Sequence, residues 1–343
     1  MKPKNLITIA LFCLLVGLPV GLFLNTMAQE RSKPASNYRL SGPYTHKNLT
    51  VFLVHGKDQT TKTFLTLEEA LAQKKVRVYE TKDVNELAIR NLSNQDIYVQ
   101  SGDVVRGGDQ DRMISIDFIV PPKSGRMPIA AFCVESDRWS KRGNEPSEVF
   151  ASSSNSVATK ELKLAAKRDN SQQAVWENVA LAQAKLSKNV GGSVNNNVSV
   201  SSFELSLEDS KVKDSTAAYI NALSGLVRTR SDVIGYVFAI NGEINSADVY
   251  ASHALFAKLW PKLLKSTAVE AVAELKPDLA PKPVVDDQIH GFLAESEKAS
   301  PATKAVTTRV KLVTREDDKN IFFETQDRAQ KDGWVHRNYI RKQ

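Results

Sequence analysis

Apolar and polar positions alternate over short stretches between residues 38 and 134, and this pattern predicts strands. The clearest alternation is Val-Arg-Val-Tyr-Glu at residues 76–80. A short helix is expected to begin at Thr66, because Thr66 and Glu69 have the spacing of a capping box. The spacing of the short apolar runs predicts a mostly antiparallel sheet, with strands near residues 49–54, 86–91, 97–99, 117–120 and 129–134.

The pattern becomes helical in the middle of the chain. Residues 161–188 repeat apolar side chains at helical spacing, and residues 215–228 predict a second helix. Between them, residues 191–202 form a low-complexity loop rich in Gly, Ser and Asn. Two more helices are expected near 251–265 and 266–275.

A hairpin is the strongest local signal in the chain. Apolar residues 233–240 lead into Asn241-Gly242, and the chain returns through residues 243–250. Asn-Gly supplies the positive φ angles that a type I′ turn needs. Near the C-terminus, residues 309–324 predict another hairpin.

Together these elements predict an α+β fold, with a mostly antiparallel sheet, packed helices in the middle and a strand-rich C-terminal tail. The expected segments are a leader at residues 1–28, an α+β domain at 38–275 that is either one unit or two lobes meeting near 191–202, a proline-rich linker at 277–286, and a C-terminal extension at 287–343.

The N-terminus predicts where the protein works. Lys2 and Lys4 precede an uncharged apolar run at 6–24, and small residues precede a cleavage point after Ala28. These are the parts of a secretory signal peptide. The run is almost long enough to span a bilayer, so a retained N-terminal anchor is the alternative, and the only expected membrane contact. Either reading predicts an exported protein that is periplasmic, on the cell surface or secreted.

Composition narrows the functional classes. The 46 basic and 39 acidic residues give a net charge of +7, spread along the chain rather than gathered into a nucleic-acid footprint. Cys13 lies in the leader, so the mature chain keeps only Cys133, in an apolar run that predicts a buried thiol. The five histidines lack zinc-ligand spacing, and no Walker, Rossmann or nucleophile-elbow motif is present. We therefore expect no metal site, and the sequence indicates no particular cofactor.

Acids and arginines crowd around a Gly-Gly pair, and a second polar group ends the strand that carries Cys133. The candidate ligand-binding residues are Asp103, Arg106, Gly107, Gly108, Gln110, Asp111 and Arg112 in the first group, and Glu135, Arg138 and Trp139 in the second. If the two strands are neighbours, Arg112, Glu135 and Arg138 converge. Arginine binds carboxylate or phosphate in bidentate fashion, and glycine lets backbone approach a ligand. The structural alternative is a salt-bridged turn that holds the sheet together.

The same stretches resemble a domain-of-unknown-function family that is named for gene association with ADP-ribosylglycohydrolases and rhodanese-phosphatases. The resemblance covers roughly residues 38–275, and its most specific part is the segment Gly102–Arg112. It rests also on Gly42–Leu49, Leu67–Leu71, Pro121–Gly125, Phe132–Glu135, Arg138-Trp139, Gln173–Trp176 and Ile234–Ala271. The resemblance implies no established activity, and only a weak link to ADP-ribose or nucleotide chemistry.

Three functions remain open. The first is a non-catalytic module that binds a small anionic ligand or an envelope partner, with Arg106, Arg112 and Arg138 holding an anionic group. The second is a hydrolase that acts on an ADP-ribose-like or other anionic substrate through the carboxylates of Asp103, Asp109, Asp111 and Glu135. The third is a structural envelope protein that contacts a partner through its C-terminal tail.

Overall fold

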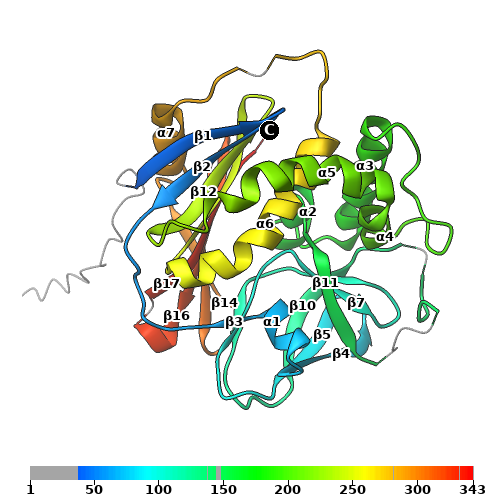
Figure 1. Ribbon diagram of the computed structural model, residues 1–343. Helices are drawn as coiled ribbons and strands as arrows, with labels where there is room; N and C mark the ends of the chain where they lie inside the picture. The colour runs from blue at the N-terminus through cyan, green and yellow to red at the C-terminus, as the bar shows by residue number, and fades with distance from the viewer. Residues whose placement is uncertain (1–37, 137, 144–147, 281, 332, 343) are drawn as a thin grey trace, which may run out of the picture. The chain divides into compact units, whose positions relative to one another are not determined.

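Figure 1 shows the computed structural model of the chain, which describes residues 38–342 except 137, 144–147, 281 and 332. The expected signal peptide, residues 1–28, lies outside the described residues. Within the described part, no helix combines the length and apolar character needed to cross a bilayer.

The largest sheet has eight strands, and every pair in it is antiparallel. Its order is β1 (Arg39–His46), β2 (Leu49–His55), β12 (Val233–Ile240), β13 (Glu243–Tyr250), β17 (Gly333–Arg341), β16 (Asn320–Asp327), β15 (Val310–Glu316) and β14 (Pro301–Ala305). The C-terminal region therefore supplies four of the eight strands. It is built into the sheet, although the sequence sets it apart as an extension.

Two smaller sheets carry the segment between β2 and β12. The six-stranded sheet runs β11 (Phe150–Val157), β7 (Asp103–Gly107), β8 (Arg112–Ile114), β10 (Met127–Cys133), β5 (Glu86–Asn91) and β4 (Val76–Asp83). The three-stranded sheet runs β3 (Leu65–Thr66), β6 (Ile97–Val99) and β9 (Phe118–Val120), and its β3–β6 pair is parallel. The expected α+β fold with mostly antiparallel sheets and a strand-rich C-terminal region is thus confirmed.

The described residues also form seven α-helices: α1 (Leu67–Ala72), α2 (Lys160–Lys167), α3 (Gln172–Asn189), α4 (Phe203–Glu208), α5 (Ser210–Leu223), α6 (His253–Ala273) and α7 (Asp286–Ser296). Short 3₁₀ helices lie at Ser224–Leu226 and Arg328–Gln330. The helix expected at 161–188 is two helices, because Asn170 takes a left-handed φ of 49° and Ser171 caps α3. The two helices expected at 251–275 are one, and Pro261 lies inside it. Buried neighbours such as Trp260 and Leu264 hold α6 continuous through the proline.

Helix α6 is the central packing element (Figure 1). It packs on β12 and β13 of the large sheet and on β11 of the six-stranded sheet, and it also touches α3 and α5. Helix α7 packs on β16 and β17. Apolar side chains such as Phe52, Phe292 and Tyr339 form a second core separate from the main one.

The expected hairpin is confirmed as β12 and β13. Asn241 and Gly242 take φ angles of 55° and 81° at its turn. A Cβ added at Gly242 would lie 2.5 Å from the carbonyl oxygen of Lys282. Glycine is required there both for the turn and for the close passage of the chain that leads to α7.

Candidate functional site

Asp111, Glu135, Arg138 and Arg142 form a buried group that we call the acid–arginine cluster. Asp111 lies just before β8, and Glu135 just after β10, so the antiparallel pairing of these strands brings the two carboxyls together. The Asp111 N–H donates to Glu135 Oε2 at 2.9 Å, and Arg138 Nε donates to the same oxygen at 2.9 Å. Arg142 Nη1 lies 3.1 Å from Asp111 Oδ2 and 3.2 Å from Glu135 Oε1.

The two carboxyls of this cluster have opposite pKa shifts. Burial, together with the neighbouring Glu135 charge, raises the pKa of Asp111 to about 7. Burial also acts to raise the pKa of Glu135, but hydrogen bonds from Arg138 and from the Asp111 N–H outweigh it and hold that pKa below its ordinary value. Each arginine faces carboxyl groups of the protein itself.

Arg112 does not join Glu135 and Arg138. Its strand does lie beside the Cys133 strand, with Arg112 opposite Cys133, so the condition for convergence is met and the convergence of Arg112 is still wrong. Side chains alternate along a strand, so Asp111 and Arg112 point to opposite faces. The Arg112 guanidinium instead donates to the carbonyl of Val84 at 2.6 Å and to Cys133 Sγ at 2.9 Å, and it lies 3.4 Å from Glu80 Oε1.

The other candidate residues of the first group are dispersed. The buried carboxylate of Asp103 pairs with Lys262 at 2.7 Å, on the side of α6. Arg106 is 27% exposed and pairs with Glu208. Gln110 is fully buried, and neither atom of its amide has a hydrogen-bond partner in the part of the chain that is described. Asp109 pairs with Lys82 at 2.7 Å.

The remaining candidates surround the Gly-Gly turn. Gly107 and Gly108 take φ angles of 126° and 57°. Arg138 Nη1 donates to the carbonyl of Gly108 at 3.2 Å, so this arginine holds the turn rather than an external anion. Trp139 is 56% exposed. Sequence reasoning missed Arg142, which follows this tryptophan in a basic loop; its role depends on the folding of that loop over Asp111.

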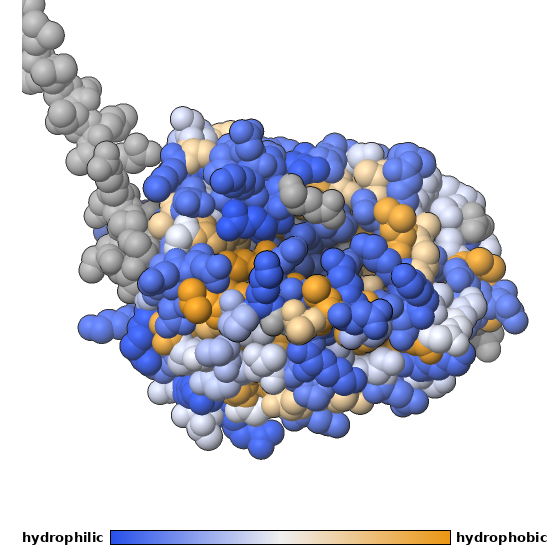
Figure 2. Space-filling view, turned by 90° about the horizontal axis from the view of Figure 1, so that it is seen from above, coloured by the Kyte–Doolittle hydropathy of each residue, from blue (hydrophilic) through white to orange (hydrophobic). Residues whose placement is uncertain are grey.

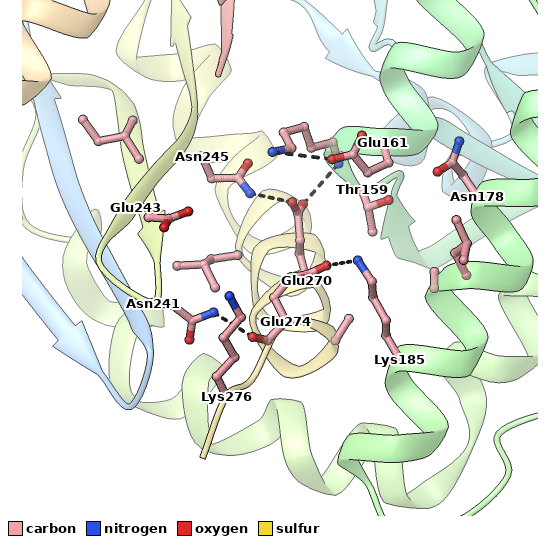
Figure 3. A pocket seen from close by; sticks show the side chains of 16 residues that line it. Thr159, Glu161, Asn178, Lys185, Asn241, Glu243, Asn245, Glu270, Glu274 and Lys276 are labelled. Atoms are coloured by element: carbon pink, nitrogen blue, oxygen red, sulfur yellow. Dashed lines mark hydrogen bonds and ion pairs between the residues drawn. The ribbon is translucent and has the colours of Figure 1, made fainter. Parts of the chain in front are cut away.

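A separate cavity of about 480 Å³ lies between α3, α6 and β13, with the start of α2 at its rim (Figure 3). It is lined by Thr159, Lys160, Glu161, Asn178, Leu181, Ala182, Lys185, Ile240, Asn241, Glu243, Ile244, Asn245, Glu270, Ala273, Glu274 and Lys276. We call it the α3/α6/β13 cavity. None of the sequence candidates lines it. A volume of this size suits a small-molecule ligand.

Glu270 and Asn245 are buried polar side chains that line this cavity and lie side by side (Figure 3). Asn245 Nδ2 donates to Glu270 Oε1 at 2.7 Å, and the Lys160 N–H donates to Glu270 Oε2 at 3.2 Å. Burial raises the pKa of Glu270 in spite of the nearby Lys160 charge. Asn245 Oδ1 is buried without a hydrogen-bond partner among the described residues. No local sequence signal points to this pair, because Asn245 and Glu270 come from a strand and a helix that meet only in the fold.

The described residues contain no group of three or more His, Cys, Asp or Glu side chains placed to hold a metal ion. Cys133 is buried as expected, and burial raises the pKa of its thiol to about 11. A thiol with this pKa is a poor nucleophile at neutral pH.

These features define the class of protein: an α+β protein built on mostly antiparallel sheets, with a buried acid–arginine cluster and a separate polar cavity. The chain belongs to the ARPP-1 family, the ARG and Rhodanese-Phosphatase-superfamily-associated Protein domain, which it matches over residues 37–340. The expected family is confirmed. The expected range of the resemblance, residues 38–275, is too short, because the match continues to residue 340 and includes the C-terminal strands. No curated protein and no solved structure matches the chain.

Proposed function

We propose that this protein is a non-catalytic binding module and that the α3/α6/β13 cavity is its ligand site. The observation that carries the proposal is Asn245, which lines the cavity and whose buried Oδ1 has no hydrogen-bond partner among the described residues. A buried acceptor left without a donor costs about 1–3 kcal/mol, which a ligand that supplies the donor recovers.

The acid–arginine cluster fits a structural role better than a ligand site. Arg138 and Arg142 are both more than nine-tenths buried, and their guanidinium groups face carboxylates of the protein. An external anion would have to displace these partners and leave them buried and uncompensated, which is costly. The geometry therefore favours the cavity over the Gly107–Arg112 turn.

A thermal-shift screen of the mature protein tests the proposal. The panel holds nucleotides, ADP-ribose, sugars, organic anions and divalent metals, and each compound is run against wild type, Asn245→Leu and Arg106→Ala. We expect a saturable shift with one chemical class that is lost in Asn245→Leu and kept in Arg106→Ala. A saturable shift that survives in Asn245→Leu would place the site elsewhere.

Hydrolysis is the second candidate function, and one observation favours it. The pKa of Asp111 is about 7 while that of Glu135 is lowered, which is the separation an acid and a base need. Both side chains are fully buried, so a substrate could reach them only after the loop that carries Arg138 and Arg142 had moved. Hydrolysis of a chromogenic ester, phosphate or glycoside that Asp111→Asn abolishes would favour this function over binding.

We also propose that the protein works outside the cytoplasm, on the strength of the basic start and apolar run at residues 1–28. Mass spectrometry of the protein recovered from an exporting bacterial host tests this. A mature N-terminus at Gln29 supports a cleaved signal peptide, an intact N-terminus in the membrane fraction supports the anchor, and an intact protein in the cytoplasm contradicts export.

A further inference from the structure

The charged groups of the α3/α6/β13 cavity are not evenly matched. Its lining contains four glutamates and three lysines. Two lysines are paired within the cavity: Lys185 lies 2.5 Å from Glu274, and Lys160 lies 3.5 Å from Glu161. The lining then retains the carboxyls of Glu243 and Glu270 against the ammonium of Lys276, and the charges of Lys160 and Lys163 also act on Glu270.

The unmatched acceptors come from neighbouring elements. Glu243 and Asn245 both lie on β13, where the pairing with β12 skips Asn245, so that the strand bulges at this residue. Glu270 reaches Asn245 from α6 through a hydrogen bond (Figure 3). The wall formed by β13 and α6 therefore presents an orphaned amide oxygen and two carboxyls.

We propose, building on the proposed function, that the cavity binds a small primary amine in its protonated form. The ammonium donates to Asn245 Oδ1 and to the carboxyl of Glu270. An ammonium has three N–H donors, so it can satisfy both groups at once, and its charge compensates a buried carboxylate. A neutral hydroxyl has one donor, so it would satisfy only one of the two acceptors.

The competing explanation is that Glu270 serves only the fold. Its carboxyl accepts from the Lys160 N–H at the start of α2, where the side chain of Thr159 makes no capping bond. That role accounts for Glu270 but leaves Asn245 Oδ1 without a donor. Asn245 is therefore the residue that separates ligand binding from helix capping.

Isothermal titration with probes of one skeleton tests the proposal on the mature protein. The amine probes are butylamine, 4-aminobutanoate and 1,4-diaminobutane, and the matched probes without an amine are butanoate and 4-hydroxybutanoate. Three variants are compared with wild type: Asn245→Leu, Glu270→Gln and the control Asn178→Leu. Asn178 lines the same cavity, but its amide donates to the Ala174 carbonyl of its own helix. Thermal unfolding of each variant reports whether the fold is retained.

We expect at least one amine probe to bind, with affinity about tenfold or more weaker in Asn245→Leu and in Glu270→Gln and unchanged in Asn178→Leu. Equal binding of the hydroxyl or carboxylate probe would overturn the amine assignment and leave the proposed function standing. If another class of compound from the screen binds in wild type but not in Asn245→Leu, and amines do not bind, the amine assignment is again overturned and the proposed function stands. If neither amines nor any compound of the screen binds, the amine assignment and the proposed function both fail.

Discussion

His336 Nδ1 lies 2.8 Å from Asp117 Oδ2, in the interior of the molecule. The other ring nitrogen, Nε2, lies 3.0 Å from Asp248 Oδ1. His336 lies on β17, Asp117 lies just before β9, and Asp248 lies on β13. The imidazole therefore joins the C-terminal strand to two earlier parts of the chain. The His336 ring also stacks on Tyr250, with 4.4 Å between ring centroids.

The stability that His336 contributes through Asp117 and Asp248 depends on pH. Burial alone would lower the pKa of His336, but the two carboxylates outweigh it and raise the pKa above the ordinary 6.5. Burial would raise the pKa of Asp117, but the charges of Lys167 and His336 hold it far below 3.8. The His336 contribution to stability is therefore complete below pH 6.5 and is lost as the pH rises through the raised pKa, whereas the Asp117 contribution is lost only in strong acid.

His336→Asn tests the sign of this effect. Near pH 5.5 we expect the variant to unfold with a free energy about 3–5 kcal/mol below wild type, because two buried carboxylates lose the cation that hydrogen-bonds to both and keep only the more distant charges of Lys167 and Lys163. The difference should narrow as the pH rises above 6.5, when wild-type His336 also becomes neutral. Urea unfolding at a series of pH values measures it. Asp111, whose pKa is about 7, lowers stability with rising pH in both proteins and cancels from the difference. A gap that stays constant from pH 5 to 9 would contradict a charged His336.

Arg112 and Arg106 each form an ion pair with a glutamate, and the two pairs differ in how deeply they are buried. Arg112 and Glu80 are 3% and 2% exposed, and Arg112→Ala leaves the Glu80 carboxylate buried without its cation. We expect a loss of about 3–5 kcal/mol in the free energy of unfolding. Arg106→Ala removes a pair whose side chains are 27% and 29% exposed, and we expect a loss of about 0–1 kcal/mol. Urea unfolding at pH 7 compares them, and equal losses would contradict the structural role of Arg112.

Gly108 and Gly125 differ in the space around them. A Cβ at Gly108 would lie 2.5 Å from a ring carbon of Phe150 and 2.5 Å from Glu80 Oε2, at a φ of +57°. A Cβ at Gly125 meets nothing within 4 Å. We expect Gly108→Ala to cost roughly 1–3 kcal/mol or more, from the clash and the left-handed backbone, and Gly125→Ala to leave the melting temperature nearly unchanged. Scanning calorimetry distinguishes them, and an unchanged Gly108→Ala would show that Phe150 can yield.

Local sequence signals predicted local structure well. The capping box of Thr66 and Glu69 is present, and Asn241-Gly242 forms the expected turn, because both depend on residues within a few positions. The placement of β17 beside β13 depends on backbone pairing between segments nearly ninety positions apart, such as Asp248 and Asn338. No periodicity carries that information.

The same reasoning explains the candidate site. Sequence proximity indicated the residues around Gly107-Gly108, and the structure does bring Asp111, Glu135 and Arg138 together. The sequence alone could not show that Arg112 faces the other side of its strand. Nor could it show the cavity, since the Asn245–Glu270 contact joins a strand and a helix.

Truncation tests whether the C-terminal region is an appendage or part of the fold. A chain that ends at Ala280 loses α7 and the four strands β14–β17. It exposes the edge of β13, which β17 covers in the full chain, and it removes His336 from between Asp117 and Asp248. An exposed edge strand promotes aggregation, and buried carboxylates without their cation destabilise the core. We therefore expect the truncated chain to be insoluble, or to lack a cooperative unfolding transition by circular dichroism.

A control that removes only Lys342 and Gln343, beyond the end of β17, should unfold as wild type does. A soluble, cooperatively folded chain ending at Ala280 would show instead that the N-terminal strands and α6 suffice for the fold.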